Sequence, residues 1–328
     1  MYPKISIVTP SFNQGQYIEQ TIQSVLNQNY PNLEYIIIDG GSTDETVEII
    51  KRYEQHITYW VSVKDKGQTD AINKGFAKCT GEIFNWLNSD DYYEPNTLHR
   101  VGQAFKDNDN IRVVCGKEWG FKDDNPNDRV LHAGSIIKEN VYQSILTGVI
   151  DQPCTFFSKS PIEPFFPLDI SLCYVMDRQL WWSYLLKFGQ DYILQTEDVL
   201  TNFRLHSISK SVAYADLFEA EFDRLKGSLL KQLKAPQVLL NQFEEGIKPL
   251  NRYWDIKIEE QKIIAAFAGY YATCSYVKDD WQATKQLIKL VKKYKGEPLS
   301  KTEWKQWFST NVLSEKSLQF FKGIKAKI

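Results

Sequence analysis

An alternation of apolar runs and helix-like segments over residues 4–88 limits the fold more than any other feature of this sequence. Four runs have the apolar character of strands buried in a sheet: residues 4–10, 33–39, 57–63 and 83–88. Three segments between them repeat apolar residues at helical spacing: residues 15–29, 43–53 and 68–78. Strands that alternate with helices form βαβ units, so the pattern predicts a mostly parallel sheet flanked by helices.

The residues that follow the predicted strands are polar, and this places a candidate site. Right-handed crossovers put the carboxyl ends of parallel strands on one edge of the sheet, where ligands bind. The polar groups at that edge are residues 9–13, 39–44, 65–68 and 88–91. Taken singly, each would be an ordinary cap or turn. Asp39 and the adjacent Asp90 and Asp91 come directly after buried strands, where two neighbouring like charges need a partner.

Composition and missing motifs exclude several classes of protein. The formal net charge of the 328 residues is −2, which argues against a general polyanion binder, so we expect no nucleic-acid partner. The five cysteines are scattered without a CxxC pair, as in free thiols of a reducing cytosol. We expect a cytoplasmic protein, because no signal peptide is visible and no apolar run approaches the ~20 residues of a membrane span. The chain also lacks a dinucleotide-binding GxGxxG, a P-loop and a GxSxG elbow.

Two long segments closely resemble family 2 glycosyltransferases with the GT-A fold: IVTPSFNQGQYIEQTIQSVLNQNYPNLEYIIIDGGSTDETVEII and DKGQTDAINKGFAKCTGEIFNWLNSDD. The resemblance is strong over residues 4–105 and continues more weakly through QPCTFFSK, YVMDRQLWWSYLLKFG and NFRLHSISKS. It implies a GT-A domain over residues 1–214, with about 1–110 binding a nucleotide-sugar and about 111–214 binding the acceptor. We expect residues 215–328 to be a helical C-terminal region.

The resemblance implies a nucleotide-sugar donor, usually a UDP-sugar, bound in the N-terminal half. Three positions resemble the family's nucleobase wall: Thr9, Pro10 and Phe12. Asp39 matches the carboxylate that accepts the N3–H of uracil. Asp70, in GQTDAINKG, matches a position near the nucleotide and its phosphates, with Lys66 or Lys74 as a charge partner.

The segment Asn88-Ser89-Asp90-Asp91 matches the family's metal segment, often written DxDD. Asn88 replaces the first carboxylate, so we expect Asp90 and Asp91 to divide metal ligation and contact with the ribose or a bound water. Mn²⁺ or Mg²⁺ fits, because such ions take one or two carboxylates with phosphates and water. The metal would neutralise charge on the leaving diphosphate. His206 falls where some relatives place a histidine near the metal; the alternative is a structural histidine.

The second half is expected to bind the acceptor and to supply the base. Asp177, in YVMDRQLWW, falls where family members place an acidic residue that opens a helix below the sugar. A helix N-terminus would keep this carboxylate ionised, and the bland alternative is a simple helix-start aspartate. Gln152 and Arg204 are weaker candidates for the same cleft. The expected reaction is inverting transfer to a hydroxyl of a glycan, lipid-linked or protein-linked acceptor.

Two other functions stay open at this point. A sugar-nucleotide pyrophosphorylase-like nucleotidyltransferase would use a glycine-rich, arginine-containing turn after the first strand, and this sequence has none. A non-catalytic nucleotide- or glycan-binding protein would not need Asp177 together with both metal carboxylates.

The C-terminal region reads as helices over residues 217–233, 259–277 and 281–294, the last two forming a hairpin. Residues 284–328 carry 11 lysines and three glutamates, a net charge of +8 that leaves −10 for the rest of the chain. Aromatic residues accompany these lysines: Trp304, Trp307, Phe308, Phe320 and Phe321. Such a tail, residues 296–328, predicts peripheral contact with the inner face of a membrane, or else a helical cap with solvated lysines.

Overall fold

The computed structural model describes residues 2–132, 135, 140–207, 209–243, 250 and 253–312. The chain divides into two compact units, each described below by itself. The first unit comprises Met1–Lys138 and Gly148–Glu221, and the second comprises Glu139–Thr147 and Phe222–Ile328. The division thus falls a few residues after the boundary expected from the sequence, and a short internal segment joins the C-terminal helices.

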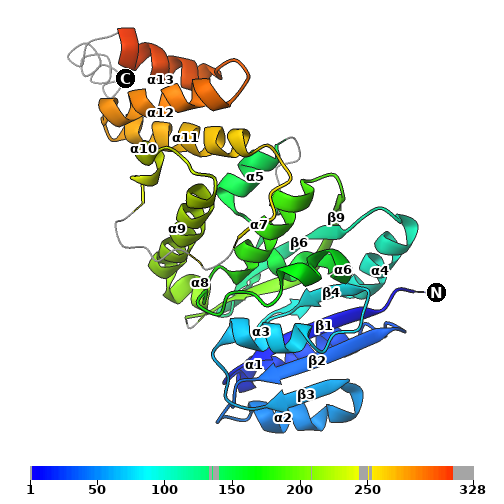
Figure 1. Ribbon diagram of the computed structural model, residues 1–328. Helices are drawn as coiled ribbons and strands as arrows, with labels where there is room; N and C mark the ends of the chain where they lie inside the picture. Colours follow the sequence, from blue (N-terminus) through cyan, green and yellow to red (C-terminus); the bar gives the residue numbers. More distant parts are fainter. Residues whose placement is uncertain are drawn as a thin grey trace. The chain divides into compact units, whose positions relative to one another are not determined.

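The first unit is built on one sheet of strand order β3-β2-β1-β4-β8-β6-β9-β5, with β7 paired to β6 (Figure 1). Its N-terminal strands are β1 (Ile5–Ser11), β2 (Leu33–Asp39), β3 (Tyr59–Ser62) and β4 (Ile83–Trp86). Strand β1 runs parallel to β2 and β4, and β2 runs parallel to β3. The predicted parallel sheet is therefore confirmed, and the carboxyl ends of these strands share one edge.

The other half of the sheet is mixed. It contains β5 (Tyr92–Tyr93), β6 (Val113–Lys122), β7 (Asn125–His132), β8 (Thr155–Ser158) and β9 (Ile193–Leu205). Strand β8 is antiparallel to both β4 and β6, whereas β9 is parallel to β6 and antiparallel to β5. The pairing of β9 with β5 brings the carboxyl end of β9 beside the residues that follow β4.

Helices cover both faces of the sheet. One face packs against α1 (Gly15–Leu26), α2 (Thr46–Arg52) and α4 (Thr97–Asp107) through a buried cluster that includes Ile7, Ile18, Ile37, Ile50 and Leu98. The other face packs against α3 (Gln68–Phe76) and α7 (Met176–Phe188), as the ring pairs Phe76–Phe84 and Phe157–Trp181 show. Each fully buried apolar side chain contributes ~1.5–3 kcal/mol, so the sheet is a rigid base for its edge.

One glycine lets α3 approach β1 closely. A Cβ atom on Gly75 would lie 2.4 Å from Cγ1 of Val8, a separation that real Cβ atoms essentially never show. The short elements that complete the unit are α6 (Lys159–Ile162), α8 (Lys210–Ala213) and the 3-10 turns Glu54–His56, Gln152–Cys154 and Glu163–Phe165.

The second unit is helical, as expected. Its helices are α5 (Val141–Thr147), most of α9 (Ala215–Gln232), α10 (Gln237–Leu240), α11 (Glu260–Val277), α12 (Trp281–Tyr294) and α13 (Lys301–Val312). Helices α11 and α12 form the predicted hairpin, and the carboxylate of Asp280 caps α12 by accepting the N–H of Ala283 at 2.9 Å. Gln306 of α13 donates to Thr273 of α11 at 2.9 Å.

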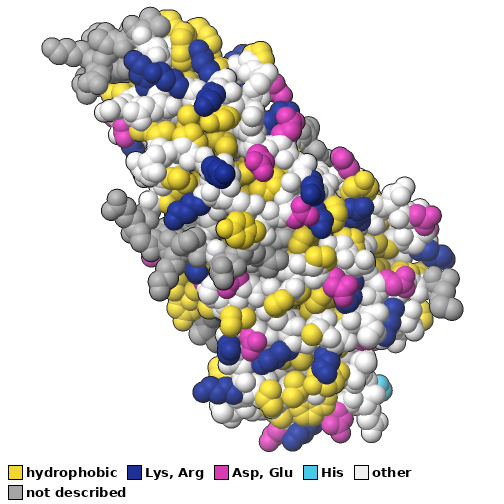
Figure 2. All heavy atoms as spheres, in the orientation of Figure 1, with side chains coloured by type: hydrophobic (Ala, Val, Ile, Leu, Met, Phe, Trp, Pro, Cys, Tyr) yellow, Lys and Arg dark blue, Asp and Glu magenta, His cyan; other side chains and the backbone are white. Residues whose placement is uncertain are grey.

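Lysines and aromatic rings mix in the described part of the basic tail. Figure 2 shows dark blue and yellow side chains interspersed in the region of α12 and α13. Trp304 is 54% exposed, whereas the ring of Trp307 lies 3.7 Å below Nζ of Lys292. Phe320 and Phe321 lie outside the described residues. No described helix has the length and apolar character needed to cross a bilayer, and contact of the tail with a membrane surface stays a prediction.

Candidate active site

Asp39 ends β2 as a fully buried carboxylate that organises the loop after it. Its Oδ2 accepts the N–H groups of Gly41 and Ser42 at 3.1 and 2.9 Å and the hydroxyl of Ser62 at 2.6 Å. Among the described residues, its Oδ1 accepts only the hydroxyl of Ser42, at 2.5 Å. Gly41 adopts a φ of +85°, which glycine tolerates best, so the turn can fold back on the carboxylate. Oδ1 therefore keeps capacity for one more donor.

The loop after β1 presents a mixture of buried and exposed groups. Thr9 is buried and its hydroxyl lies 3.1 Å from the hydroxyl of Tyr35, and Pro10 is also buried. Phe12, by contrast, is 58% exposed. Of the three predicted nucleobase contacts, only Phe12 thus offers an exposed side chain. The hydroxyl of Ser11 is buried and has no hydrogen-bond partner among the residues that the structure describes.

The predicted phosphate-side residues lie at the start of α3. Asp70 forms an ion pair with Lys74 at 2.8 Å and accepts the backbone N–H of Lys66 at 3.1 Å. The hydrogen bond from Lys74 is the main reason that the pKa of Asp70 lies below its usual value. Of the two lysines proposed as charge partners, Lys74 is engaged with Asp70, while the side chain of Lys66 is exposed.

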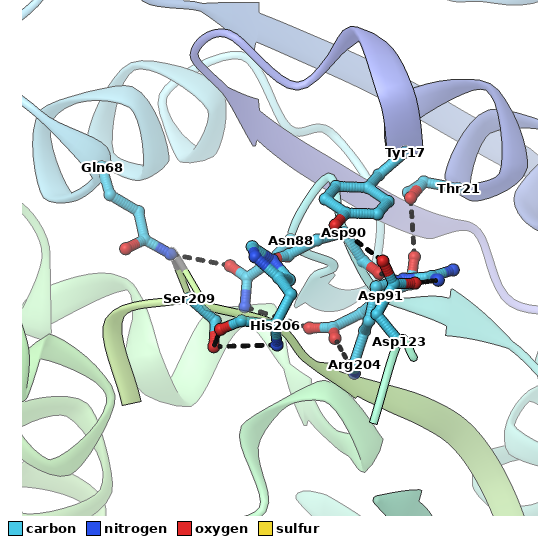
Figure 3. Close-up of polar contacts among 10 residues, drawn as sticks. All are labelled: Tyr17, Thr21, Gln68, Asn88, Asp90, Asp91, Asp123, Arg204, His206 and Ser209. Carbon is cyan, nitrogen blue, oxygen red and sulfur yellow. Dashed lines mark hydrogen bonds and ion pairs between the residues drawn. The ribbon is translucent and has the colours of Figure 1, made fainter. Parts of the chain in front are cut away.

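The structure separates the two adjacent carboxylates of the predicted metal segment (Figure 3). Oδ2 of Asp90 lies 3.0 Å from Nε2 of His206, whose ring packs against Tyr17 at 4.8 Å. The other ring nitrogen of His206, Nδ1, is buried, and no described residue forms a hydrogen bond with it. Asp91 is buried elsewhere: its Oδ1 accepts the backbone N–H of Arg204 at 3.0 Å and its Oδ2 faces the amide of Asn88 at 3.2 Å.

Burial raises the pKa of Asp91 well above its usual value, and the nearby charge of Asp90 raises it further. The Arg204 guanidinium also holds this segment, because its Nε donates to the backbone oxygen of Asp90 at 3.0 Å and its Nη1 pairs with Asp123 at 2.5 Å. Arg204 thus fastens β9 to the metal segment by internal contacts. Gln152 is likewise engaged inside the protein, because its amide donates to the backbone oxygen of Trp86 at 2.8 Å.

The chemistry of the Asp90–His206 pair fits a divalent cation. The 3.0 Å between Oδ2 of Asp90 and Nε2 of His206 is a hydrogen-bond or ion-pair distance, so the two side chains are partners of each other in this structure. A carboxylate oxygen and an imidazole nitrogen are both atoms that a divalent cation accepts as ligands. Among the described residues, no three acidic, histidine or cysteine side chains gather as a complete metal cage. Asp90 and His206 would thus share an ion with oxygens from a ligand or water.

Asp177 lies in the first turn of α7, as predicted. Its Oδ1 accepts the N–H of Arg178 at 2.7 Å, and the described residues place no other side-chain hydrogen bond on it. We expected the helix N-terminus to keep this carboxylate ionised, but burial outweighs that effect and raises the pKa of Asp177. The preceding loop is held by Glu221, whose carboxylate accepts the N–H groups of Cys173 and Tyr174, both at 2.8 Å.

Two polar residues that sequence reasoning did not single out connect these parts. Gln68 donates from Nε2 to Oδ1 of Asn88 at 2.7 Å, and its Oε1 accepts from Nζ of Lys210 at 2.9 Å. Gln68 follows β3 among the polar edge residues, and Lys210 stands four residues after His206 in NFRLHSISKS. Their positions near the predicted site were the only sequence signal for Gln68 and Lys210. Nothing in the sequence indicates that the two side chains contact each other.

Comparison with known proteins agrees with this architecture. The family model described as Glycosyl transferase family 2 matches residues 6–166. An uncharacterized glycosyltransferase of Rickettsia typhi is 30% identical over 243 residues, which cover 73% of this chain and 75% of the relative. The putative teichuronic acid biosynthesis glycosyltransferase TuaG of Bacillus subtilis is 31% identical over 163 residues, covering 47% of this chain and 64% of TuaG.

Solved structures of low sequence identity share the fold. S. aureus TarS 1–349 in complex with UDP superposes with a TM-score of 0.59 at 16% identity, covering 96% of this chain and 91% of that one. The mannosyltransferase PcManGT from Pyrobaculum calidifontis, in complex with GDP-Man and Mn²⁺, gives a TM-score of 0.50 at 13% identity, covering 97% and 87%. The first unit is a GT-A fold, and the protein is a glycosyltransferase that belongs to glycosyltransferase family 2.

Proposed function

We propose that this protein is a metal-dependent, inverting glycosyltransferase that moves a sugar from a UDP-sugar to a hydroxyl of a glycan, lipid-linked or protein-linked acceptor. The observation that carries the proposal is the Asp90–His206 pair, with 3.0 Å between Oδ2 and Nε2, at the edge where β1, β2 and β4 end. The UDP bound by TarS and the Mn²⁺ bound by PcManGT support the same donor and cofactor classes here.

The donor nucleotide would lie against the ends of β1 and β2. Oδ1 of Asp39 has capacity for the N3–H of uracil, but the carboxylate is fully buried, so contact with the base would require the turn at Ser42 that covers it to move. The exposed ring of Phe12 offers an apolar face for the base. Thr9 and Pro10 would contribute through the backbone, since their side chains are buried. The exposed ammonium of Lys66, beside Asp70, could approach the phosphates.

Asp90 and His206 would hold the cation together with diphosphate oxygens. Mg²⁺ prefers oxygen ligands alone, so the imidazole of His206 favours Mn²⁺. A bound ion supplies Lewis-acid stabilisation of the charge on the leaving diphosphate. Asp91 takes a different role in this proposal: buried and bonded to the N–H of Arg204, it positions β9 and with it His206.

Asp177 would be the general base. A sugar hydroxyl is a weak nucleophile at neutral pH, so its proton must leave as it attacks the anomeric carbon. The carboxylate of Asp177 has an uncommitted oxygen among the described contacts, and its raised pKa makes it a stronger proton acceptor. Attack from the face opposite the leaving diphosphate inverts the anomeric configuration.

A turnover assay with product analysis tests this proposal. We expect release of UDP from UDP-sugars in the presence of Mn²⁺, loss of release in excess EDTA, and an inverted anomeric configuration by NMR in the transfer product. A product that retains the donor's configuration would contradict the mechanism. A pyrophosphorylase would instead need a sugar-1-phosphate and a nucleoside triphosphate, and a binding protein would turn over neither pair of substrates.

A further inference from the structure

Lys210, which opens α8 just after His206, is a lysine whose positive charge has no ion-pair partner among the described residues. Its Nζ donates to Oε1 of Gln68 and to the backbone oxygen of Cys173, both at 2.9 Å. Both acceptors are neutral. The ring of Tyr174 lies 5.6 Å from the same Nζ, and among the described residues no third hydrogen-bond acceptor meets the ammonium, which has three N–H groups.

The environment of Lys210 favours an anionic ligand. The side chain is largely withdrawn from water, and burial lowers the pKa of the lysine. The charges of Glu221 and Asp90 act in the opposite direction and raise this pKa, but neither carboxylate contacts the ammonium. A partly buried cation without a counter-charge is less favourable than a paired one, so its retention beside a ligand site is explained if the ligand supplies the negative charge.

The two acceptors of Lys210 place it between the two halves of the site. Gln68 also bonds to Asn88, two residues before Asp90 in the metal segment (Figure 3). Cys173 belongs to the loop that leads into α7, four residues before Asp177. The ammonium of Lys210 therefore contacts Gln68, which bonds to the segment of the proposed metal ligand Asp90, and Cys173, in the loop before the proposed base Asp177.

We propose that Lys210 binds the β-phosphate of the donor's nucleoside diphosphate through its third N–H. This inference rests on the proposed function. When the bond between the anomeric carbon and the β-phosphate oxygen breaks, the electron pair stays on that oxygen, and a fixed ammonium there stabilises the leaving group. Lys74 cannot easily take this role because it is paired with Asp70 at 2.8 Å, and Lys66 is exposed.

A set of three ligands isolates the contact with the β-phosphate. Calorimetric titration in Mn²⁺ would measure the affinity of the full chain for UDP, UMP and uridine, in the wild type, Lys210→Gln and Lys210→Arg. We expect Lys210→Gln to weaken UDP binding by about tenfold to a hundredfold, because hydrogen bonds to charged groups have that worth. The affinity for uridine should stay unchanged, and Lys210→Arg should retain most of the UDP affinity.

A matched control is Lys159→Gln. Lys159 is also largely buried, but it is paired with Glu163 at 3.0 Å and follows β8 near the amino end of β4, at the opposite edge of the sheet. This variant should bind all three ligands as the wild type does.

The two proposals fail in different ways. A wild type that does not bind UDP would overturn the proposed function. A wild type that binds UDP, with Lys210→Gln binding UDP equally well, would overturn only the role of Lys210. Equal losses of UDP and uridine affinity would also overturn it, because they would show that Lys210 supports the fold of the site rather than the β-phosphate. A loss in Lys210→Arg as large as that in Lys210→Gln would contradict the need for a positive charge.

Discussion

The two edges of the parallel sheet differ in how completely their buried polar groups are hydrogen-bonded within the chain. At the amino edge, the carboxylate of Glu34 on β2 accepts from Lys4 at 2.8 Å, from Ser6 at 2.5 Å and from the N–H of Thr80 at 2.7 Å. Burial alone would raise the pKa of Glu34, but these hydrogen bonds lower it to about 2. At the carboxyl edge, the hydroxyl of Ser11 and Nδ1 of His206 are buried without a hydrogen-bond partner in the described part of the chain.

The titration of the carboxylates shows the same contrast. Burial raises the pKa of Asp91 and of Asp177, both near the carboxyl edge, and no set of donors compensates as it does at Glu34. Polar groups that are satisfied within the chain stabilise the fold, whereas buried groups without a partner in the chain are completed by water or by a ligand. The amino edge therefore serves stability, and we propose that the carboxyl edge serves the donor.

The largest effect on turnover is expected when the proposed general base, Asp177, is removed. Asp177→Asn should lower kcat by ~10²–10⁴, because the acceptor hydroxyl loses its proton acceptor. Affinity for UDP should stay near the wild-type value, which calorimetry can measure beside turnover. In the wild type, kcat/KM should fall at acid pH with a midpoint above the 3.8 of an exposed aspartate, since the pKa of Asp177 is raised. Near-normal turnover in the variant would rule out this base.

The adjacent carboxylates offer a comparison within one segment. Asp90→Asn should weaken Mn²⁺ binding by about tenfold to a hundredfold and reduce turnover with it, because a proposed ligand is lost. Asp91→Asn should instead lower the melting temperature while Mn²⁺ affinity changes little, because its carboxylate bonds to the backbone of Arg204. Titration of Mn²⁺ in the presence of UDP would measure both. The reverse pattern would make Asp91 the ligand.

A smaller effect, on UDP affinity, is expected when the proposed contact with the uracil ring is removed. Asp39→Asn should weaken UDP binding by ~1–3 kcal/mol and reduce the preference for UDP over CDP, because cytosine has no N3–H to donate. Ser62→Ala is the matched control, since it removes one bond to Oδ2 of Asp39 and leaves Oδ1 untouched. Competition binding with UDP and CDP gives both ratios. Equal wild-type affinity for the two nucleotides would refute the assignment.

The smallest effect on turnover is expected at the amino edge. Glu34→Gln should lower the free energy of unfolding by about 1–3 kcal/mol at pH 7 and leave kcat unchanged. Because the pKa of Glu34 falls from 4.5 to about 2 on folding, its stabilisation is present above pH 4.5 and is lost as the pH falls toward 2. Urea unfolding of both proteins across this range should show the difference shrinking. A difference that persists at pH 2 would mean that the ionised carboxylate is not its source.

The sequence predicts the parallel half of the sheet and little of the mixed half. Strand β2 is predicted well because LEYIIID is a nearly continuous apolar run. Strand β9 mixes charged and partly exposed residues, so it lacks the continuous apolar run that predicts β2. The hairpin of α11 and α12 was predicted almost to the residue, because helical spacing and the cap at Asp280 both mark its boundaries.

The candidate site likewise contains residues that the sequence predicts and contacts that it does not. Asp39 and Asp90 were found because they follow parallel strands, and the topology alone places such residues together. The different surroundings of Asp90 and Asp91 were not predictable, because they depend on the backbone of β9 at Arg204. The contact of Lys210 with Gln68 joins residues 142 positions apart and depends on the same long-range pairing.

The lack of a side chain at Gly75 allows the short distance between helix α3 and strand β1. Helix α3 lies so close to β1 that one added carbon would press on Val8, so the distance between helix and strand is defined by a single absent atom. The same helix carries Gln68 and Asp70 in its first turn. A rigid helix that is displaced at one end is also displaced at the other. A side chain at position 75 would therefore shift Gln68 and Asp70, about two turns away. The positions of Gln68 and Asp70 thus depend on a residue that is not itself part of the proposed donor site.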